Sequence, residues 1–206
     1  MPKTRLSRSV LVILLAFPFC CVLISGEDRK NNVDKILSSF PGYHLLTLKE
    51  RDSDTRAFIL HHFPKANASV VHADFDGDGH LDYALLLRND KSQATKLVVL
   101  LCSEDEHCRS VYESDVSAYS DSVYLRVVTK GSRLSQTEAV DTNHTTPVNL
   151  KSSGIQVTYF EKGKVVLYWN KKKTSTWLAY TLACDSDDSF RRLTSSVRTF
   201  PLLYSP

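Results

Sequence analysis

Residues 71–87, which read VHADFDGDGHLDYALLL, join a closely spaced set of acids directly to an apolar segment. Aspartates occupy relative positions 1, 3, 5 and 9 of the stretch 74–82, namely Asp74, Asp76, Asp78 and Asp82. Gly77 and Gly79 lie between them and permit the tight coiling that would gather the four carboxylates around one point. From residue 81 onward the pattern has the period of a β-strand. The stretch therefore predicts an acidic loop that leads into a strand.

The chemistry of this loop favours a hard divalent cation, because four carboxylates this close repel one another when no metal is present. The expected ligands are the side chains of Asp74, Asp76, Asp78 and Asp82 and the backbone carbonyl of His80. Ca²⁺ fits better than Mg²⁺, because it accepts many oxygen ligands in irregular geometry. The loop is not an EF-hand, since Leu85 occupies position 12, where that motif needs a bidentate Glu. An acidic surface turn made of Asp and Gly, which turns favour, is the alternative interpretation.

Two short helices are expected before the loop. Asn32 can cap the first helix, which Pro41 and Gly42 would end. Its apolar residues recur at helical spacing and are Val33, Ile36, Leu37 and Phe40. Ser53 or Asp54 can cap the second helix, which Pro64 would end. Its apolar side is predicted to consist of Ile59, Leu60 and Phe63.

Strands dominate the rest of the chain. Apolar or alternating segments occur at 81–87, 97–101, 123–127, 155–159, 165–169 and 177–182. Short connections between successive strands favour antiparallel pairing. The predicted fold is therefore α+β: one or two N-terminal helices packed on a mostly antiparallel β-meander sheet, in a single domain over residues 27–185. Residues 131–153 predict a polar loop, and residues 186–206 a Ser-rich C-terminal tail.

Residues 1–26 have the composition of a secretory signal peptide. Three basic residues precede the uncharged run from Val10 to Ile24, and a polar stretch follows. The run is shorter than the ~20 residues that a membrane-spanning helix requires. Cleavage of the segment and its retention as an N-terminal anchor both remain open, and both place the body outside the cytoplasm, either periplasmic or secreted.

The charge balance argues against nucleic-acid binding. The chain has 26 Lys and Arg against 23 Asp and Glu, and three of the basic residues lie in the first 25, where no acid occurs. The remaining body therefore has 23 basic and 23 acidic residues. A neutral body without a basic stripe offers no electrostatic footprint for a phosphate backbone.

The cysteines agree with an oxidising compartment. Cys102 and Cys108 flank a short polar stretch, and their spacing suits a small loop closed by a disulfide. Buried or unreactive thiols are the alternative interpretation. Cys20 and Cys21 lie in the N-terminal apolar run, so Cys184 is left without an assigned partner.

The segment VHA followed by DFDGDGHLDYALLL resembles the calcium loop of FG-GAP/VCBS-type repeats, which are known from integrin-like propellers and many extracellular bacterial proteins. The resemblance implies that Asp74, Asp76, Asp78 and Asp82 hold the ion between two strands. Propellers contain several such loops and this chain has one, so a multi-blade propeller is excluded. Over residues 33–185 the chain is similar to small bacterial extracytoplasmic proteins with a lone loop of this kind, a resemblance that implies no activity.

These observations predict a non-catalytic, extracytoplasmic calcium-binding module for binding or adhesion, with a protein or glycan as its partner. Contact with a membrane is expected only if the N-terminal segment stays uncleaved. Tyr168, Trp169 and Trp177 could form an aromatic face for a glycan, although aromatic residues in strands more often pack within the sheet.

A hydrolase is the alternative function. Asp-Phe-Asp-Gly at 74–77 also opens the loop of haloacid-dehalogenase-type phosphatases, in which the first Asp is the nucleophile and the second an acid or base. On this interpretation Asp74 and Asp76 take those roles. That family requires alternating helices and strands after the loop, whereas this chain predicts a β-meander. His61, His62 and His72 lack an accompanying nucleophile motif.

Overall fold

The computed structural model describes residues 26–105, 107–134, 147–170 and 176–183. Most of the predicted signal segment, the predicted tail 186–206 and Cys184 lie outside these ranges. Within them, no helix combines the length and the apolar character needed to cross a membrane.

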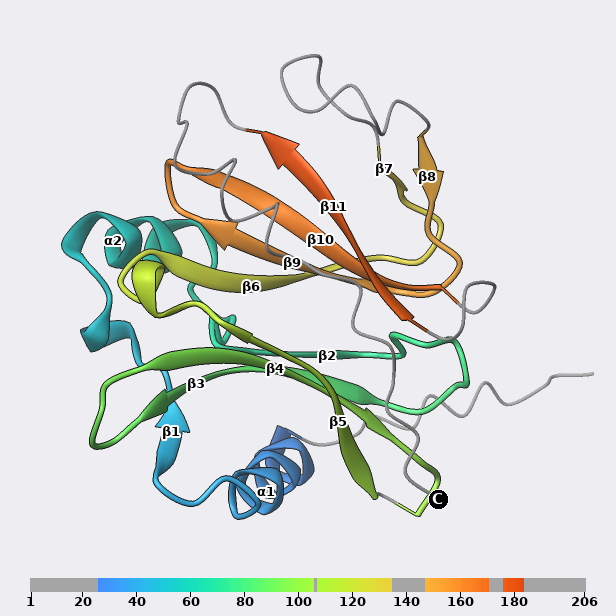
Figure 1. Ribbon diagram of the computed structural model, residues 1–206, viewed down its shortest axis with the longest axis horizontal. Coiled ribbons are helices and arrows are strands. Elements are labelled where there is room, and N and C mark those ends of the chain that lie inside the picture. The colour runs from blue at the N-terminus through green and yellow to red at the C-terminus, as the bar shows by residue number, and fades with distance from the viewer. Residues whose placement is uncertain (1–25, 106, 135–146, 171–175, 184–206) are drawn as a thin grey trace, which may run out of the picture. The chain divides into compact units, whose positions relative to one another are not determined.

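Antiparallel strands form two sheets (Figure 1). The first contains β1 (Tyr43–Leu45), β2 (Val70–Ala73), β3 (Asp82–Asn89), β4 (Thr95–Cys102) and β5 (Cys108–Asp115). The second contains β6 (Val123–Val128), β9 (Gly154–Tyr159), β10 (Gly163–Asn170) and β11 (Thr176–Ala183). A separate short pair, β7 (Arg133–Leu134) and β8 (Val148–Asn149), lies within the predicted polar loop. The predicted α+β class with β-meander strands is confirmed.

β3 is the strand of the first sheet that pairs with β1, β2 and β4. Its residues pair with β4 along one edge, in the register Ala84↔Val99. β2 and β1 share the other edge, with Val71 opposite Ala84 and Leu45 opposite Leu87. β2, β3, β4 and β5 follow one another as hairpins, which places the turn between β2 and β3 beside the turn between β4 and β5 at one end of the sheet (Figure 1).

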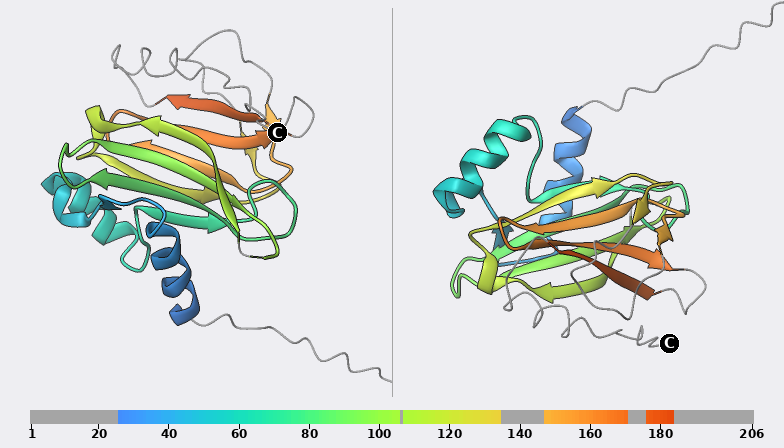
Figure 2. Two further views of the ribbon diagram at one scale, coloured as in Figure 1. Left: turned by 60° about the horizontal axis from the view of Figure 1, so that its bottom comes forward. Right: turned by 90° about the horizontal axis from the view of Figure 1, so that it is seen from above.

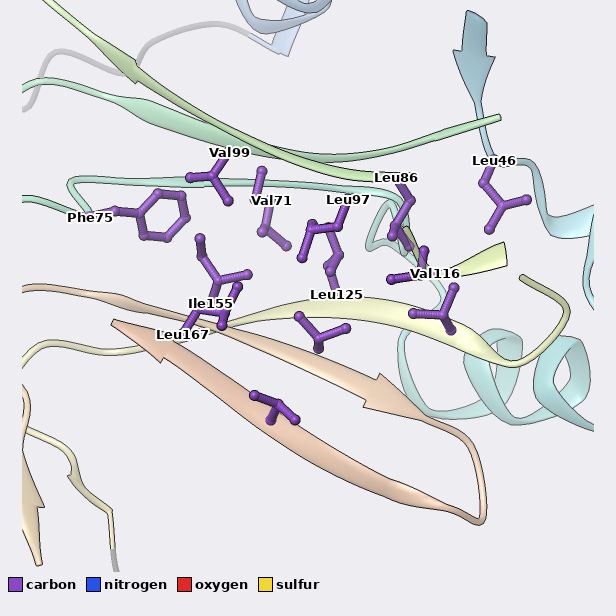
Figure 3. Close-up of a cluster of buried hydrophobic side chains, with 14 of the residues drawn as sticks. Leu46, Val71, Phe75, Leu86, Leu97, Val99, Val116, Leu125, Ile155 and Leu167 are labelled. Atoms are coloured by element: carbon purple, nitrogen blue, oxygen red, sulfur yellow. The ribbon is translucent and has the colours of Figure 1, made fainter. Parts of the chain in front are cut away.

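The main hydrophobic core lies between the two sheets. Alternate residues of β3 and β4, such as Leu86 and Val99, face Leu125, Ile155 and Leu167 of the second sheet (Figure 3). The turned views of Figure 2 show the sheets as two layers. The sequence predicted a single sheet with helices packed on it, whereas the structure has two sheets. Short connections indicate which strands are neighbours, but they do not indicate where one sheet ends and the next begins. The chain crosses between the sheets after β5, through the 3₁₀ turn η2 (Ser117–Tyr119).

The helices differ from expectation at their ends and faces. Helix α1 spans Gly26–Leu37, so it begins before the predicted cap at Asn32. Helix α2 spans Ser53–His62, and its cap is Asp52, whose carboxylate accepts the backbone N–H groups of Asp54 and Thr55. An Asp preceding the predicted cap fulfils the same role, because its oxygens also reach the free N–H groups of the first turn.

Helix α2 packs through a narrower apolar face than predicted. Ile59 is 1% exposed and forms a buried cluster with Ala68 and Tyr124, whereas Leu60 is 51% exposed. Leu60 follows Ile59 directly and points about 100° away from it around the helix axis, which takes it out of the buried stripe.

Candidate functional site

The acidic loop joins β2 to β3, as the sequence predicted. Ala73 and Asp82 form the last pair of the β2–β3 ladder, so the loop consists of residues 74–81. Gly77 and Gly79 have φ values of 79° and 96°, a conformation that side chains with a Cβ rarely adopt. The two glycines therefore make the sharp coil of the loop possible.

Three of the four predicted carboxylates converge. Asp74, Asp76 and Asp78 each offer one oxygen, and these oxygens lie within 4.8 Å of one another. Two oxygens bound to one Ca²⁺ at about 2.4 Å each can be at most ~4.8 Å apart, so the spacing fits a shared ion. The side chains of Asp74 and Asp76 are half-buried and that of Asp78 is exposed, which leaves room for water as a further ligand.

Backbone N–H groups of the loop fix the orientation of these side chains. Gly77 N donates to Asp74 Oδ1 at 2.5 Å, and Gly79 N donates to Asp74 Oδ2 at 3.2 Å. Asp78 N donates to Asp76 Oδ1 at 3.0 Å, and His80 N donates to Asp78 Oδ1 at 2.8 Å. Because an ionised carboxylate offers about four lone-pair sites, each side chain keeps acceptor capacity for a cation.

Asp82 lies outside this group and occupies a different environment. Its side chain is fully buried, with Oδ2 accepting Phe75 N at 2.8 Å and Oδ1 accepting Cys102 N at 3.0 Å. The pKa of Asp82 is raised to about 6, mainly by burial and to a smaller extent by the charges of Asp76 and Asp78, while the N–H groups of Cys102 and Phe75 oppose the shift. A cation in the loop would favour the ionised form. Coordination by Asp82 itself and by the His80 carbonyl remains a prediction.

The loop is anchored in the core through residues that the sequence did not indicate. Phe75 is fully buried and its ring lies between the sheets, near Val71, Val99 and Ile155 (Figure 3). Its carbonyl accepts the Ser152 hydroxyl at 2.6 Å, and the adjacent Asp74 carbonyl accepts Ser153 N at 3.2 Å. Ser152 and Ser153 precede β9 of the second sheet, and nothing in their local sequence distinguishes them from other loop serines.

The predicted disulfide is confirmed, and it lies at the same end of the first sheet. Cys102 and Cys108 are bonded, with Cα atoms 4.0 Å apart, and they form the last pair of the β4–β5 ladder. Cys102 N is also a donor to Asp82, so the disulfide and the acidic loop share a partner.

The other candidate residues are distributed elsewhere. His61 and His62 are exposed at the end of α2, where the His62 ring lies 4.3 Å from that of Phe58. His72 is half-buried on β2, its ring 6.1 Å from that of Tyr83. Trp169 is 9% exposed and belongs to the main core, so it does not present a face to a glycan.

The geometry can hold one hard cation on side-chain oxygens at the surface of a turn that is anchored in the core through Phe75. Comparison of the chain with models of protein families, with curated proteins and with solved structures gives no match. The function must therefore be argued from the site itself.

Proposed function

We propose that this protein is an extracytoplasmic, non-catalytic calcium-binding module of FG-GAP/VCBS-like type that serves binding or adhesion to a protein or glycan. The supporting observation is the convergence of the Asp74, Asp76 and Asp78 carboxylates within 4.8 Å of one another. Three negative charges at this spacing are unfavourable unless a cation offsets them. Oxygen-only ligands on a turn with exposed positions favour Ca²⁺ over Mg²⁺, which requires near-ideal octahedral geometry.

The anchoring of the loop favours a stabilising role for the ion over a catalytic one. Phe75, the residue between the first two ligands, is fully buried in the core, and Ser152 from the second sheet holds its carbonyl. An ion that fixes the acidic loop would therefore also fix the contact between the sheets. Extracellular modules typically bind calcium with Kd values of ~10⁻⁴–10⁻³ M, which suits such a role.

The hydrolase alternative gains no support from the fold. A phosphatase of the haloacid-dehalogenase type would follow Asp74 and Asp76 with alternating helices and strands. Here the loop closes an antiparallel hairpin of β2 with β3, and every described strand pair is antiparallel.

The disulfide supports the proposed location, because such bonds persist mainly in oxidising compartments. We expect the exported protein to begin near Ser25–Glu27, after removal of the signal segment. Intact-mass measurement of protein from the culture medium or periplasm checks this. Full-length protein found only in the membrane fraction would favour the anchor instead.

Thermal unfolding in chelator and in 10 mM Ca²⁺ tests the calcium site. For a Kd of ~10⁻⁴–10⁻³ M, calcium should stabilise the fold by about 1.4–2.7 kcal/mol. That corresponds to a rise in Tm of roughly 3–10 °C, and Mg²⁺ should produce much less. Asp76→Ala and Asp78→Ala should abolish the rise, because each removes a ligand oxygen.

Two further variants separate metal binding from loop geometry. Asp78→Asn keeps an acceptor for His80 N while it removes one charge, so it should melt higher than wild type in chelator and gain less from calcium. Asp121→Asn changes an exposed carboxylate outside the loop and should respond to calcium as wild type does. If the Tm of the wild type is the same in chelator and in calcium, the calcium site is wrong and the loop is only an acidic surface turn.

A further inference from the structure

A continuous set of buried contacts connects the disulfide with the acidic loop. Cys102 is 7% exposed, and its N–H donates to Asp82 Oδ1 at 3.0 Å. The other oxygen of Asp82 accepts the N–H of Phe75 at 2.8 Å, and Phe75 lies between the ligands Asp74 and Asp76. Asp82 and Phe75 are both fully buried, so water does not compete for these hydrogen bonds.

We propose that the Cys102–Cys108 disulfide regulates the affinity of the acidic loop for its cation, with Asp82 as the coupling residue. This inference rests on the proposed calcium-binding function. In the oxidised protein, the disulfide fixes the end of β4, and thereby the Cys102 N–H that orients Asp82. Asp82 in turn holds the backbone of the loop in the conformation that gathers the three carboxylates.

The end of the β4–β5 ladder depends on this covalent link. The register shifts between Val99 and Leu100, so only the pairs from Leu100 to Cys102 continue beyond the irregularity. Their partners Arg109 and Ser110 are exposed, and β5 is the outermost strand of the described sheet. Leu100, Leu101 and Cys102 on β4 are buried, but their partners on β5 bury little surface, so without the disulfide the start of β5 can separate from β4 and leave the Cys102 end of β4 at an open edge.

The redox step is an ordinary thiol–disulfide exchange. A dithiol reductant transfers two electrons and two protons, the S–S bond between Cys102 and Cys108 breaks, and two cysteine thiols form while the reagent becomes a cyclic disulfide. Cys108 is half-buried on the outermost strand of the described sheet and precedes the exposed Arg109, so a small reductant would approach the bond from this side. The coupling between the two sites is reciprocal. If reduction weakens calcium binding by a given factor, bound calcium must make the disulfide harder to reduce by the same factor.

Titration calorimetry with Ca²⁺ on the full chain tests the proposal. We expect the Kd of the oxidised protein to rise at least fivefold after treatment with dithiothreitol, and to rise similarly in the Cys102→Ser/Cys108→Ser variant. That variant retains Cys20, Cys21 and Cys184, so a rise of its Kd without reductant cannot come from reduction of these cysteines. In an Asp82→Asn background, the difference between oxidised and reduced protein should shrink, because Asn accepts only one of the two N–H groups.

The outcomes separate this inference from the function on which it rests. Equal Kd values in folded oxidised and reduced protein would overturn the regulation alone, whereas no calcium binding by the oxidised protein would overturn the calcium-binding function. Hydrogen exchange at Phe75 N–H gives a readout without calcium: it should accelerate on reduction, and unchanged exchange would contradict coupling through Asp82. A reduced protein that is unfolded by circular dichroism would assign the disulfide a purely structural role and also overturn the proposal.

Discussion

Arg51 shows, at the scale of single residues, how a buried charge can be held by neutral groups. Its side chain is 3% exposed, and burial lowers its pKa to about 10, which still leaves it charged at neutral pH. The guanidinium donates to the carbonyls of Val123, Leu46, Thr47 and Ala68 and to the Ser69 hydroxyl. These acceptors come from segments beside both sheets, so one side chain joins their backbones.

Replacing Arg51 should therefore be costly. We expect Arg51→Met to lower the free energy of unfolding by about 3 kcal/mol, because several buried carbonyls lose their donors. Arg51→Lys should lose a similar amount, since a single ammonium cannot occupy the positions of three nitrogens. Arg109→Met, on the exposed strand β5, should change stability by no more than ~0.5 kcal/mol. Urea unfolding compares the variants, and equal stability of Arg51→Met and Arg109→Met would contradict the assigned role.

At the scale of elements, His44 connects β1 with two neighbouring turns. Its Nδ1 contacts Asp90 Oδ1 at 2.6 Å, after β3, and its Nε2 contacts Glu50 Oε1 at 3.0 Å, in the 3₁₀ turn η1 (Leu48–Glu50). Arg88 Nε lies 3.4 Å from the same Glu50 oxygen. The hydrogen bonds to Asp90 and Glu50 raise the pKa of His44 above its ordinary value of 6.5.

The protonated imidazole should make the stability of the protein depend on pH. Because the folded pKa of His44 lies above the unfolded one, its contribution is fully present below pH 6.5 and is lost as the pH rises through the folded value. Burial raises the pKa of Glu50, but hydrogen bonds from Thr47 and His44 lower it overall, so Glu50 stays ionised in this window. His44→Gln should reduce the change in Tm between pH 6 and pH 8, whereas His107→Gln should leave that change as it is in the wild type. An unchanged slope in His44→Gln would contradict the assignment.

At the scale of the whole molecule, Phe75 belongs to the acidic loop and packs in the core between the two sheets. Phe75→Ala should lower the free energy of unfolding by about 3–5 kcal/mol, because a cavity would open where the two sheets meet. Phe75→Leu should lose less, since it fills part of that volume. Leu60→Ala, which removes an exposed side chain, is the matched control. A loss in Phe75→Ala no larger than in Leu60→Ala, measured by urea unfolding, would place the ring outside the core.

The sequence predicted the acidic loop and six strands because their residues carry a local signal. It missed β5, where Arg109, Ser110 and Glu113 show no apolar period, because this strand forms by pairing with β4. The turn between β9 and β10 has positive φ at two positions, Glu161 with φ at 58° and Gly163 with φ at 156°. Glutamate is not a residue type that local composition singles out for such a position.

The long-range contacts of the loop could not be predicted from the sequence, for a different reason. Whether Asp82 faces Cys102 depends on the register between β3 and β4, and a shift by one residue would turn its side chain to the opposite face. Ser152 reaches Phe75 across 77 residues, a contact that exists only because two sheets pack together. The cluster of Asp74, Asp76 and Asp78 was accessible from the sequence because these residues follow one another within a single turn.

The difference in sequence separation between these contacts has a kinetic consequence. The bond between Phe75 and Asp82 spans 7 residues, whereas that between Ser152 and Phe75 spans 77. Short-range contacts cost less chain entropy and form early in folding, so the β2–β3 hairpin should be in place before the second sheet closes over it. A cation held by that hairpin would stabilise the transition state and increase the rate of folding. The speed of assembly, as well as the lifetime of the finished protein, would then follow the calcium concentration of the surroundings.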